Sequence, residues 1–315
     1  MMNDLDQDAF FNGFKVAAFY CFSFVEEELI TSILQEINLL ASNSNIKGMV
    51  LFAPEGINGT ICGSPEEIRS FFEKIKPIIS GNNCEKKYSW CKKQAFRRFR
   101  ARRKNEIVTM GIKEINPNEC SGNYVEPLEW NELIDDPDTL VVDTRNEYEI
   151  AVGTFKGALN PHTDTFGDFP NWVENTLRPL VEERKPKNIA MFCTGGIRCE
   201  KATSYLKKEG FTGVNHLHGG ILKYLEEVPK AESRWEGECF VFDRRVALNH
   251  DLVPGVFRLC NACGMPLSPE DRKRNSYVRG IKCHYCESHF TDQDRSRFAE
   301  RQKYIDDLSK RLPGN

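Results

Sequence analysis

The chain has 315 residues, of which 40% are hydrophobic and 28% are charged, and its formal net charge is −3. This length predicts two or three domains, and this balance is typical of a folded globular protein, which excludes disorder of the whole chain. No apolar run approaches the roughly eighteen residues that a membrane-spanning helix needs, and the acidic start lacks the pattern of a secretory signal. We therefore expect a cytoplasmic protein without a membrane partner.

Residues 1–95 follow the order of a ferredoxin-like α+β domain, in which two βαβ halves are split around a hairpin. Apolar runs predict three of its strands, over residues 15–20, 47–52 and 57–62, and a further extended stretch over about 84–90 predicts the fourth. Apolar side chains at helical spacing predict a helix over about 26–41, and Ser64 followed by Pro65 predicts the start of a second helix. Many RNA-binding and acylphosphatase-like domains share this order, so the order alone assigns no function.

Residues 96–124 are basic and extended, and we expect them to link the first domain to the second. Ten Lys or Arg residues fall between Lys86 and Lys104, with no acidic residue among them. Two phenylalanines stand among the arginines, and this mixture suits phosphate contacts with base stacking, although charge runs also occur as solvated surfaces. The residues expected to bind nucleic acid are Arg97, Arg98, Arg100, Arg102, Arg103 and Lys104.

Residues 125–230 predict a doubly wound α/β domain. Residues 139–143 and 188–193 are apolar runs typical of parallel strands buried on both faces, and helical segments alternate with them. Residues 231–315 predict loops and short strands, a cysteine-rich module and a polar helix over about 292–311. We therefore expect a multidomain α/β protein in three parts.

A six-residue loop at the end of the second of these strands has the composition of an anion-binding site. Its glycines let successive backbone N–H groups point at one spot, and such a nest beside a helix N-terminus favours an exposed thiolate over a thiol. A thiolate surrounded by amide donors can hold an extra sulfur as a persulfide. The loop consists of Cys193, Thr194, Gly195, Gly196, Ile197 and Arg198. The next residue, Cys199, either resolves an oxidised Cys193 or is a buried side chain.

Two C-x-x-C pairs near the C-terminus have the spacing of a zinc site. The pairs are separated by nineteen residues and consist of Cys260, Cys263, Cys283 and Cys286. Four thiolates at this spacing close a tetrahedral site, so we expect a structural zinc ion. Two redox pairs or an iron cluster are the competing interpretations. In a chain without an export signal we expect the other cysteines to be reduced.

Residues 141–160 and 192–211 resemble the two signature regions of the rhodanese family. The resemblance implies a central rhodanese domain in which Cys193 is the persulfide-bearing nucleophile. Three charged residues match the first signature, and the resemblance implies structural roles for them: Asp143, Arg145 and Glu147. Thr154 stands where the family usually has histidine, and we expect only a packing difference there. Related phosphatases have one more residue between the cysteine and the arginine, so the shorter loop disfavours phosphatase activity.

The whole chain is similar to the rhodanese-domain tRNA uridine-34 hydroxylases, a bacterial family that joins a ferredoxin-like domain, a rhodanese domain and a cysteine-rich region. The motifs that carry this resemblance lie at residues 54–60, 192–202, 216–221 and 240–248. The resemblance implies that the chain binds tRNA and forms 5-hydroxyuridine at the wobble position. It also implies that dioxygen is the co-substrate and Cys193 the essential cysteine. No residue pattern identifies the reductant.

Three functions remain open on the sequence. The first is a tRNA-modifying oxygenase, in which Cys193 either attacks C6 of uracil or carries a persulfide that is oxidised in place. The second is a sulfurtransferase that moves persulfide sulfur to a small thiol or to tRNA. The third is a non-catalytic RNA-binding or adaptor protein, in which Cys193 would be dispensable. The domains outside the rhodanese region favour the first over the second, and the intact loop disfavours the third.

Overall fold

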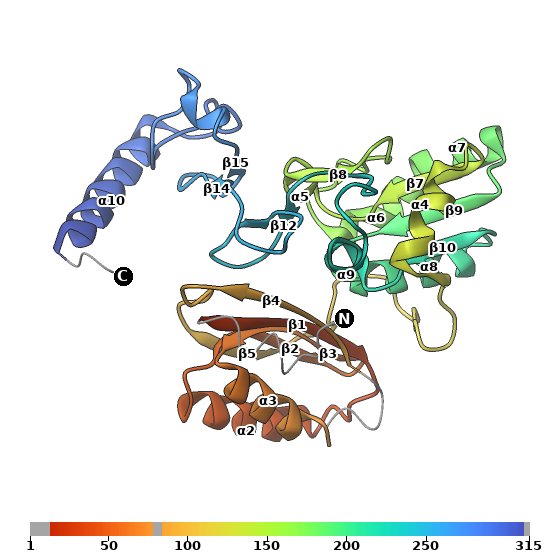
Figure 1. Cartoon of the computed structure of the whole chain (residues 1–315), viewed down its shortest axis with the longest axis horizontal. Helices are drawn as coiled ribbons and strands as arrows, with labels where there is room; N and C mark the ends of the chain where they lie inside the picture. The colour runs from red at the N-terminus through yellow and green to blue at the C-terminus, as the bar shows by residue number, and fades with distance from the viewer. Residues whose placement is uncertain (1–12, 78–83, 312–315) are drawn as a thin grey trace.

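The computed structural model describes residues 13–77 and 84–311, which form two sheet domains and a C-terminal region (Figure 1). The first domain is drawn in red to orange, the second in yellow to green, and the C-terminal region in blue. Within the described residues, no helix is both long and apolar enough to cross a membrane.

The first domain has the predicted ferredoxin-like fold with one additional strand. Its elements are β1 (Phe14–Phe22), α2 (Ile30–Ser42), β2 (Lys47–Ala53), β3 (Gly56–Gly63), α3 (Pro65–Ile75), β4 (Glu85–Cys91) and β5 (Phe99–Arg103). The sheet order is β4-β1-β3-β2-β5. Strand β1 is antiparallel to β3 and to β4, and β2 and β3 form the predicted hairpin.

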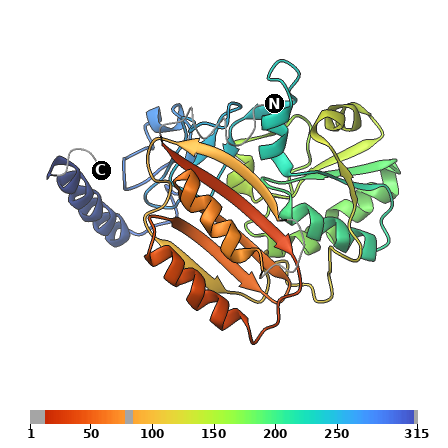
Figure 2. The same cartoon turned by 60° about the horizontal axis from the view of Figure 1, so that its bottom comes forward.

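Both helices of this domain cover the same face of the sheet, as Figure 2 shows. Ile33 and Ile37 of α2 and Phe71 of α3 pack into one core with the inward side chains of the strands. The predicted N-cap of α3 is confirmed, because the Ser64 hydroxyl accepts a hydrogen bond from the Glu67 backbone N–H in a capping box. Helix α2 begins later than predicted, because the three residues before it form a turn.

Part of the expected linker is the fifth strand of the first sheet. Strand β5 runs parallel to β2, with Arg100 opposite Met49. Side chains alternate along a strand, so Phe99 and Ala101 pack on the helix-covered core while Arg100 points to the other face. We did not expect this strand, because its high charge resembles a solvated segment and only its alternate residues are apolar.

The second domain has a four-stranded parallel sheet in the order β6-β10-β9-β7. Its strands are β6 (Asn123–Val125), β7 (Thr139–Asp143), β8 (Gly153–Phe155), β9 (Asn188–Phe192) and β10 (Val214–Leu217), of which β8 lies outside this sheet. Its helices are α4 (Pro127–Asp135), α5 (Glu147–Ile150), η1 (Phe166–Asp168), α6 (Phe169–Trp172), η2 (Val173–Leu177), α7 (Arg178–Arg184), α8 (Ile197–Lys208) and α9 (Gly220–Glu227).

Separate cores cover the two faces of this sheet, as the predicted doubly wound fold requires. Val142 and Met191 pack on one face with side chains of α8, whereas Val141 and Phe192 pack on the other with side chains of α4 and α9. Neighbouring residues of one strand thus enter different cores, which explains why these strands are apolar at every position.

The C-terminal region consists of short strands and one long helix. These are β11 (Trp235–Gly237), β12 (Cys239–Phe240), β13 (Ala247–Leu248), β14 (Arg258–Leu259), β15 (Pro266–Leu267), η3 (Asp271–Lys273) and α10 (Asp292–Arg311). Strand β11 pairs with β8 of the second domain, so the region is joined to that domain by backbone hydrogen bonds. The long polar helix was predicted over the same residues.

Buried ion pairs join the first domain to the second. The Lys201 ammonium of α8 lies 2.8 Å from Glu55, in the hairpin turn of the first domain, and 2.6 Å from Glu106. It also donates to the carbonyl oxygen of Val108. Because a buried ammonium needs such partners, these contacts fix how α8 sits against the first sheet. The cysteine loop that precedes α8 is positioned by the same contacts.

Candidate functional site

The loop from Cys193 to Arg198 curls at the carboxyl end of β9, as the sequence predicts. The backbone N–H of Gly196 donates to the Cys193 sulfur, with 3.1 Å between the two atoms. Gly196 has a φ of +102°, and a Cβ there would lie 2.7 Å from the Tyr20 hydroxyl of the first domain. A side chain at this position would therefore be strained and would also clash.

The start of α9 holds the loop from the other side. The backbone N–H groups of Ile221 and Leu222 donate to the carbonyl oxygens of Cys193 and Thr194. A Cβ on Gly220 would lie 2.5 Å from the carbonyl oxygen of Cys193, and its φ is +68°. The close approach of the two backbones explains Gly220, and Gly219 before it has a φ of +71°, which also favours glycine.

The loop arginine is paired with a carboxylate that we did not assign. The Arg198 guanidinium donates to both oxygens of Glu149, at 2.6 and 2.8 Å, and both side chains are buried. We assigned Glu147 to the charged set of the first signature, and the structure contradicts this. The Glu147 side chain is 43% exposed and lies 2.8 Å from His162. Glu149 holds the buried position because it lies on the inner side of the short helix α5.

The other two charged residues of that signature are structural, as expected. Arg145 and Asp143 are fully buried, and their side chains share two hydrogen bonds, at 2.6 and 2.9 Å. The Thr154 hydroxyl donates to Asp143 over 2.8 Å, so the replacement of the usual histidine retains a polar contact there. This set joins β7 to β8 and does not line the cavity beside the cysteine.

The surroundings of Cys193 favour its thiolate. Burial raises the pKa of Cys193, but a hydrogen bond from the Cys199 thiol, the charge of Arg198 and backbone N–H groups outweigh it and lower the pKa to about 5. Burial and the neighbouring Cys193 thiolate raise the pKa of Cys199, so Cys199 holds the shared proton. The structure thus places the two thiols in contact, and a resolving role for Cys199 stays a prediction.

The expectation of an exposed thiol is wrong, because Cys193 has 0% of its surface open to solvent. It instead lines a cavity of about 300 Å³ between the two sheet domains. The first domain contributes Tyr20, Asn58 and Lys87 to the cavity wall, and the C-terminal region contributes Phe242. The loop sequence carried no sign of this burial, because residues distant in the chain cover the sulfur.

Charged and hydroxyl groups at the domain boundary surround this cavity. The Tyr20 hydroxyl donates to Glu200 over 2.6 Å, and the Lys87 ammonium lies 3.1 Å from Glu85 and 4.9 Å from the centre of the Tyr20 ring. Burial lowers the pKa of Lys87 and raises the pKa of Glu200. Lys87 and Cys193 interact electrostatically, so the first domain supplies a cation to the cysteine site.

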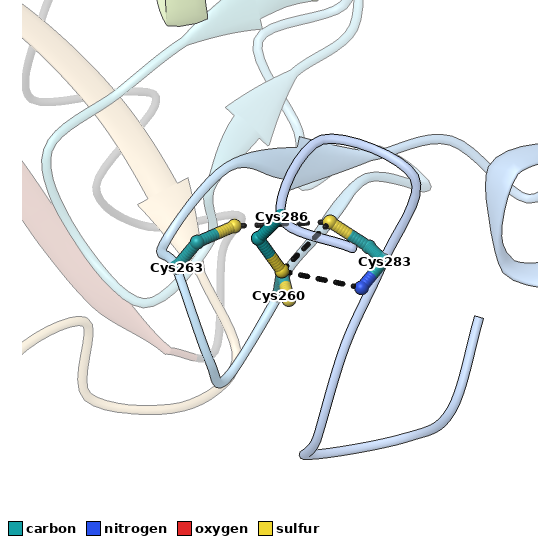
Figure 3. Close-up of side chains that lie close together, drawn as sticks. All are labelled: Cys260, Cys263, Cys283 and Cys286. Carbon is teal, nitrogen blue, oxygen red and sulfur yellow. Dashed lines mark hydrogen bonds between the residues drawn. The ribbon is translucent and has the colours of Figure 1, made fainter. Parts of the chain in front are cut away.

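The four cysteines of the C-terminal region converge on one point, as Figure 3 shows. Their sulfur atoms all lie within 4.8 Å of one another, and Cys283 is 3.7 Å from both Cys263 and Cys286. Zinc–sulfur bonds of about 2.3 Å in a tetrahedron separate the sulfurs by about 3.8 Å, so the arrangement fits a bound metal ion. Gly264, with a φ of +86°, forms the turn after the first pair.

The six basic residues predicted to bind nucleic acid do not share one face. Arg97, Arg98 and Arg100 line a second cavity of about 520 Å³ on the face of the first sheet that lacks helices. Arg103 points to the helix-covered face and forms an ion pair with Glu27. The remaining two, Arg102 and Lys104, are exposed. Across residues 13–77 and 84–311, no carboxylate pairs with Arg97 or Arg98.

Several residues of the site were missed by sequence reasoning. Asn58 and Phe242 lie inside motifs of the full-length resemblance, so attention to these motifs could have identified them. Glu149 could have been found by comparing both glutamates of α5 with the first signature. Tyr20 and Lys87 gave no signal, because a single Tyr in a strand and one Lys in a basic segment are ordinary residues.

Comparison with known proteins agrees with this architecture. Residues 14–107 match the UPF0176 acylphosphatase-like domain, and residues 126–227 match the rhodanese-like domain. The chain is thus a rhodanese-type protein that carries an acylphosphatase-like domain ahead of its cysteine loop.

Curated relatives extend this likeness to the full length. A protein of Prochlorococcus marinus is 55% identical over 315 residues, covering 100% of this chain and 98% of the relative. A Synechococcus sp. strain CC9605 protein is 54% identical over 296 residues, covering 92% and 90%. Both are named tRNA uridine(34) hydroxylase. The chain belongs to the tRNA uridine(34) hydroxylase family, which confirms the predicted resemblance.

Proposed function

We propose that this chain hydroxylates uridine 34 of tRNA at C5 and that Cys193 is the reacting side chain. The observation that carries the proposal is the cavity of about 300 Å³ beside a cysteine whose pKa is lowered to about 5. A cavity of this size holds a single extruded base, and its walls come from both sheet domains. The names of the full-length relatives support the same substrate. A tRNA substrate favours a cytoplasmic location.

In the proposed reaction the Cys193 thiolate adds to C6 of the uracil ring, which makes C5 nucleophilic towards an oxidant. Dioxygen provides one oxygen atom to C5, and the other leaves as water. A reductant therefore supplies two electrons and two protons are taken up. Loss of the proton from C5 and departure of the thiolate restore the ring. A persulfide on Cys193 is the alternative route, and its outer sulfur would lie about 2 Å from Sγ.

The open face of the first sheet contacts the tRNA in this proposal. Arg97, Arg98 and Arg100 line a cavity there, and their charges are available to phosphates. Arg102 points to the same face as Arg100, because the two stand two residues apart in β5. Arg103 is excluded from this set, since it is paired with Glu27 on the other face.

The four-cysteine cluster holds a structural zinc ion in this proposal. Four sulfur ligands leave no open position for a substrate, which separates this site from a catalytic one. The ion would fix the loops between β14 and α10, where the apolar core is small. Zinc thereby holds the C-terminal module together and takes no part in the reaction at Cys193.

Nucleoside mass spectrometry of tRNA tests the proposal. Cells that lack the protein would carry no 5-hydroxyuridine at position 34, and the wild-type gene would restore it. The Cys193→Ser variant would not restore it, whereas Cys120→Ser, which changes an exposed cysteine, would. Restoration by Cys193→Ser would contradict the role of this cysteine. Loss of a thiolated base in place of 5-hydroxyuridine would instead identify a sulfurtransferase. The intact mass of the purified protein, with or without one added sulfur, distinguishes the two routes.

A further inference from the structure

Phe242 is an exposed aromatic side chain on a loop that is held firmly in place. Its side chain is 60% exposed, although the loop between β12 and β13 is anchored on both sides. Arg245 donates to the Ser89 hydroxyl of β4 over 2.7 Å, and the Arg244 backbone N–H donates to the carbonyl oxygen of Ala95. In Figure 1 the β12 segment lies above β4 of the first sheet and beside the second domain.

The anchor of this loop is itself buried. Asp243 and Arg245 form an ion pair of 2.6 Å, with side chains that are 1% and 6% exposed. A buried, fully paired arginine fixes the loop backbone, so the position of the Phe242 ring is defined before any ligand binds. The ring also meets Phe240 and Tyr148 edge-on, at centroid distances of 5.3 and 6.4 Å. These contacts orient the ring, and Phe242 remains 60% exposed.

Phe242 stands where two cavities meet. One is the cavity beside Cys193, and the other is the cavity lined by Arg97 and Arg100. Both are also lined by Asn58, and Gly59 and Thr60 next to it contribute to both. The two cavities are therefore sections of one groove over the open face of the first sheet, and Phe242 marks its middle.

We propose that this groove holds the single-stranded RNA beside the target uridine and that Phe242 stacks on the neighbouring base. The inference rests on the proposed function, since the target base would occupy the section beside Cys193. The other section combines apolar walls, including Met49 and Phe96, with the cations Arg97, Arg98 and Arg100. Bases and phosphates of a single strand match this combination of apolar surface and positive charge.

The position of Phe242 between the sections gives it a specific task. A base stacked there ends the run of stacked nucleotides and leaves the next nucleotide free to enter the cysteine cavity. Phe242 is thus a substrate-positioning residue, distinct from the group that reacts. Stacking on an aromatic ring is tolerant of base identity, so the ring would hold the neighbour of uridine 34 in tRNAs of different anticodon sequence.

A fluorescent anticodon stem–loop RNA tests this proposal. 2-Aminopurine replaces the nucleotide on either side of uridine 34, and stacking on an aromatic ring quenches its fluorescence. Wild-type protein would quench one of the two probes. Phe242→Ala would lose the quenching and bind the RNA about ten-fold more weakly, whereas Phe242→Trp would keep both properties. Phe24→Ala is the matched control, because Phe24 is 75% exposed but lines neither cavity.

The outcomes separate this inference from the proposed function. If Phe242→Ala quenches the probes and binds as the wild type does, the stacking role is overturned, even where 5-hydroxyuridine is still formed. If wild-type protein quenches a probe but forms no 5-hydroxyuridine, the groove stands and the proposed reaction fails. Equal losses in Phe242→Ala and Phe242→Trp would also contradict the inference, because an intact aromatic face would then not matter.

Discussion

The four-cysteine cluster and the Cys193 site both hold buried sulfur atoms, but they draw on very different lengths of chain. The cluster takes all its sulfurs from residues 260–286. The Cys193 site takes its backbone donors from one loop, and the arginine of that loop pairs with Glu149 of another segment. The outer wall of the site comes from the first domain and the C-terminal region. A motif can therefore describe the first site fully and only the centre of the second.

The two sites also stabilise sulfur charge by different means. Four thiolates within 4.8 Å of one another would repel, and the metal ion proposed for the cluster would supply the compensating positive charge. The single sulfur of Cys193 is held by backbone N–H groups, by the Cys199 thiol and by Arg198. In the proposed function the cluster depends on a bound metal ion, whereas the Cys193 site depends on the fold around it.

The largest expected effect tests whether the four-cysteine cluster binds a metal ion. Cys283→Ser removes a fully buried ligand, so we expect loss of the bound metal ion and of the folding free energy it provides, about 10 kcal/mol for zinc in small modules. Elemental analysis and limited proteolysis of the C-terminal region would measure both losses. Cys120→Ser should keep one metal ion per chain. Full metal content in Cys283→Ser would show that the four sulfurs do not form one site.

The next effect tests the dependence of the cysteine loop on Glu149. Glu149→Gln keeps the shape of the side chain but removes the carboxylate charge that pairs with the buried Arg198 guanidinium, which should lower the free energy of unfolding by about 3 kcal/mol or more. Glu147→Gln is the matched control on the same helix, and its exposed pair with His162 should contribute less than about 1 kcal/mol. Urea unfolding measures both variants. Equal destabilisation would refute our assignment of Glu149.

A smaller effect concerns strand β5 and the arginines before it, which we propose to face the RNA. Neutralising Arg97, Arg98 and Arg100 together should weaken tRNA binding at low salt and reduce the slope of log affinity against log salt by about two. Arg103→Gln provides the control, because Arg103 lies on the opposite face of the same strand and is paired with Glu27. Binding measured over a salt series gives both slopes. If Arg103→Gln reduces the slope by as much as the triple variant does per arginine replaced, the open face is not the RNA surface.

The sequence was sufficient to predict the structure where the contacts are local. The Ser64 cap, the curled cysteine loop and the four-cysteine cluster each use residues within one short segment or one spaced motif, and the structure has the first two as expected and brings the four sulfurs together. The order of strands and helices in both sheet domains was also predictable, because apolar periodicity reports which face of an element is buried.

The sequence was insufficient to predict the structure where separate domains meet. Burial of Cys193 arises from side chains of β1, β3 and β4 that lie more than a hundred residues away in the chain. The fifth strand was missed for a related reason, since its pairing with β2 is set by the sheet edge and not by its own composition. Periodicity describes one element at a time and carries no information about such partners.

The smallest expected effect tests whether the first domain tunes the cysteine. Lys87 lies in the cavity wall and its charge interacts with the Cys193 thiolate, so Lys87→Met should raise the pKa of Cys193 above its value of about 5. At a pH between the two values, the variant holds less thiolate than the wild type, and the difference disappears at higher pH. The ultraviolet absorbance of the thiolate, taken as the difference from Cys193→Ser, gives the titration.

Lys86→Met supplies the control for this titration, because the two lysines are adjacent in β4 and point to opposite faces of the sheet. Lys86 is exposed, and its ammonium lies 4.6 Å from the ring centre of Phe72 in α3 on the helix-covered face. Its removal should leave the pKa of Cys193 unchanged. Identical titrations for both lysine variants would mean that the loop alone ionises Cys193. The first domain would then only cover Cys193. It would control how substrate reaches the sulfur and would contribute nothing to the charge of the sulfur.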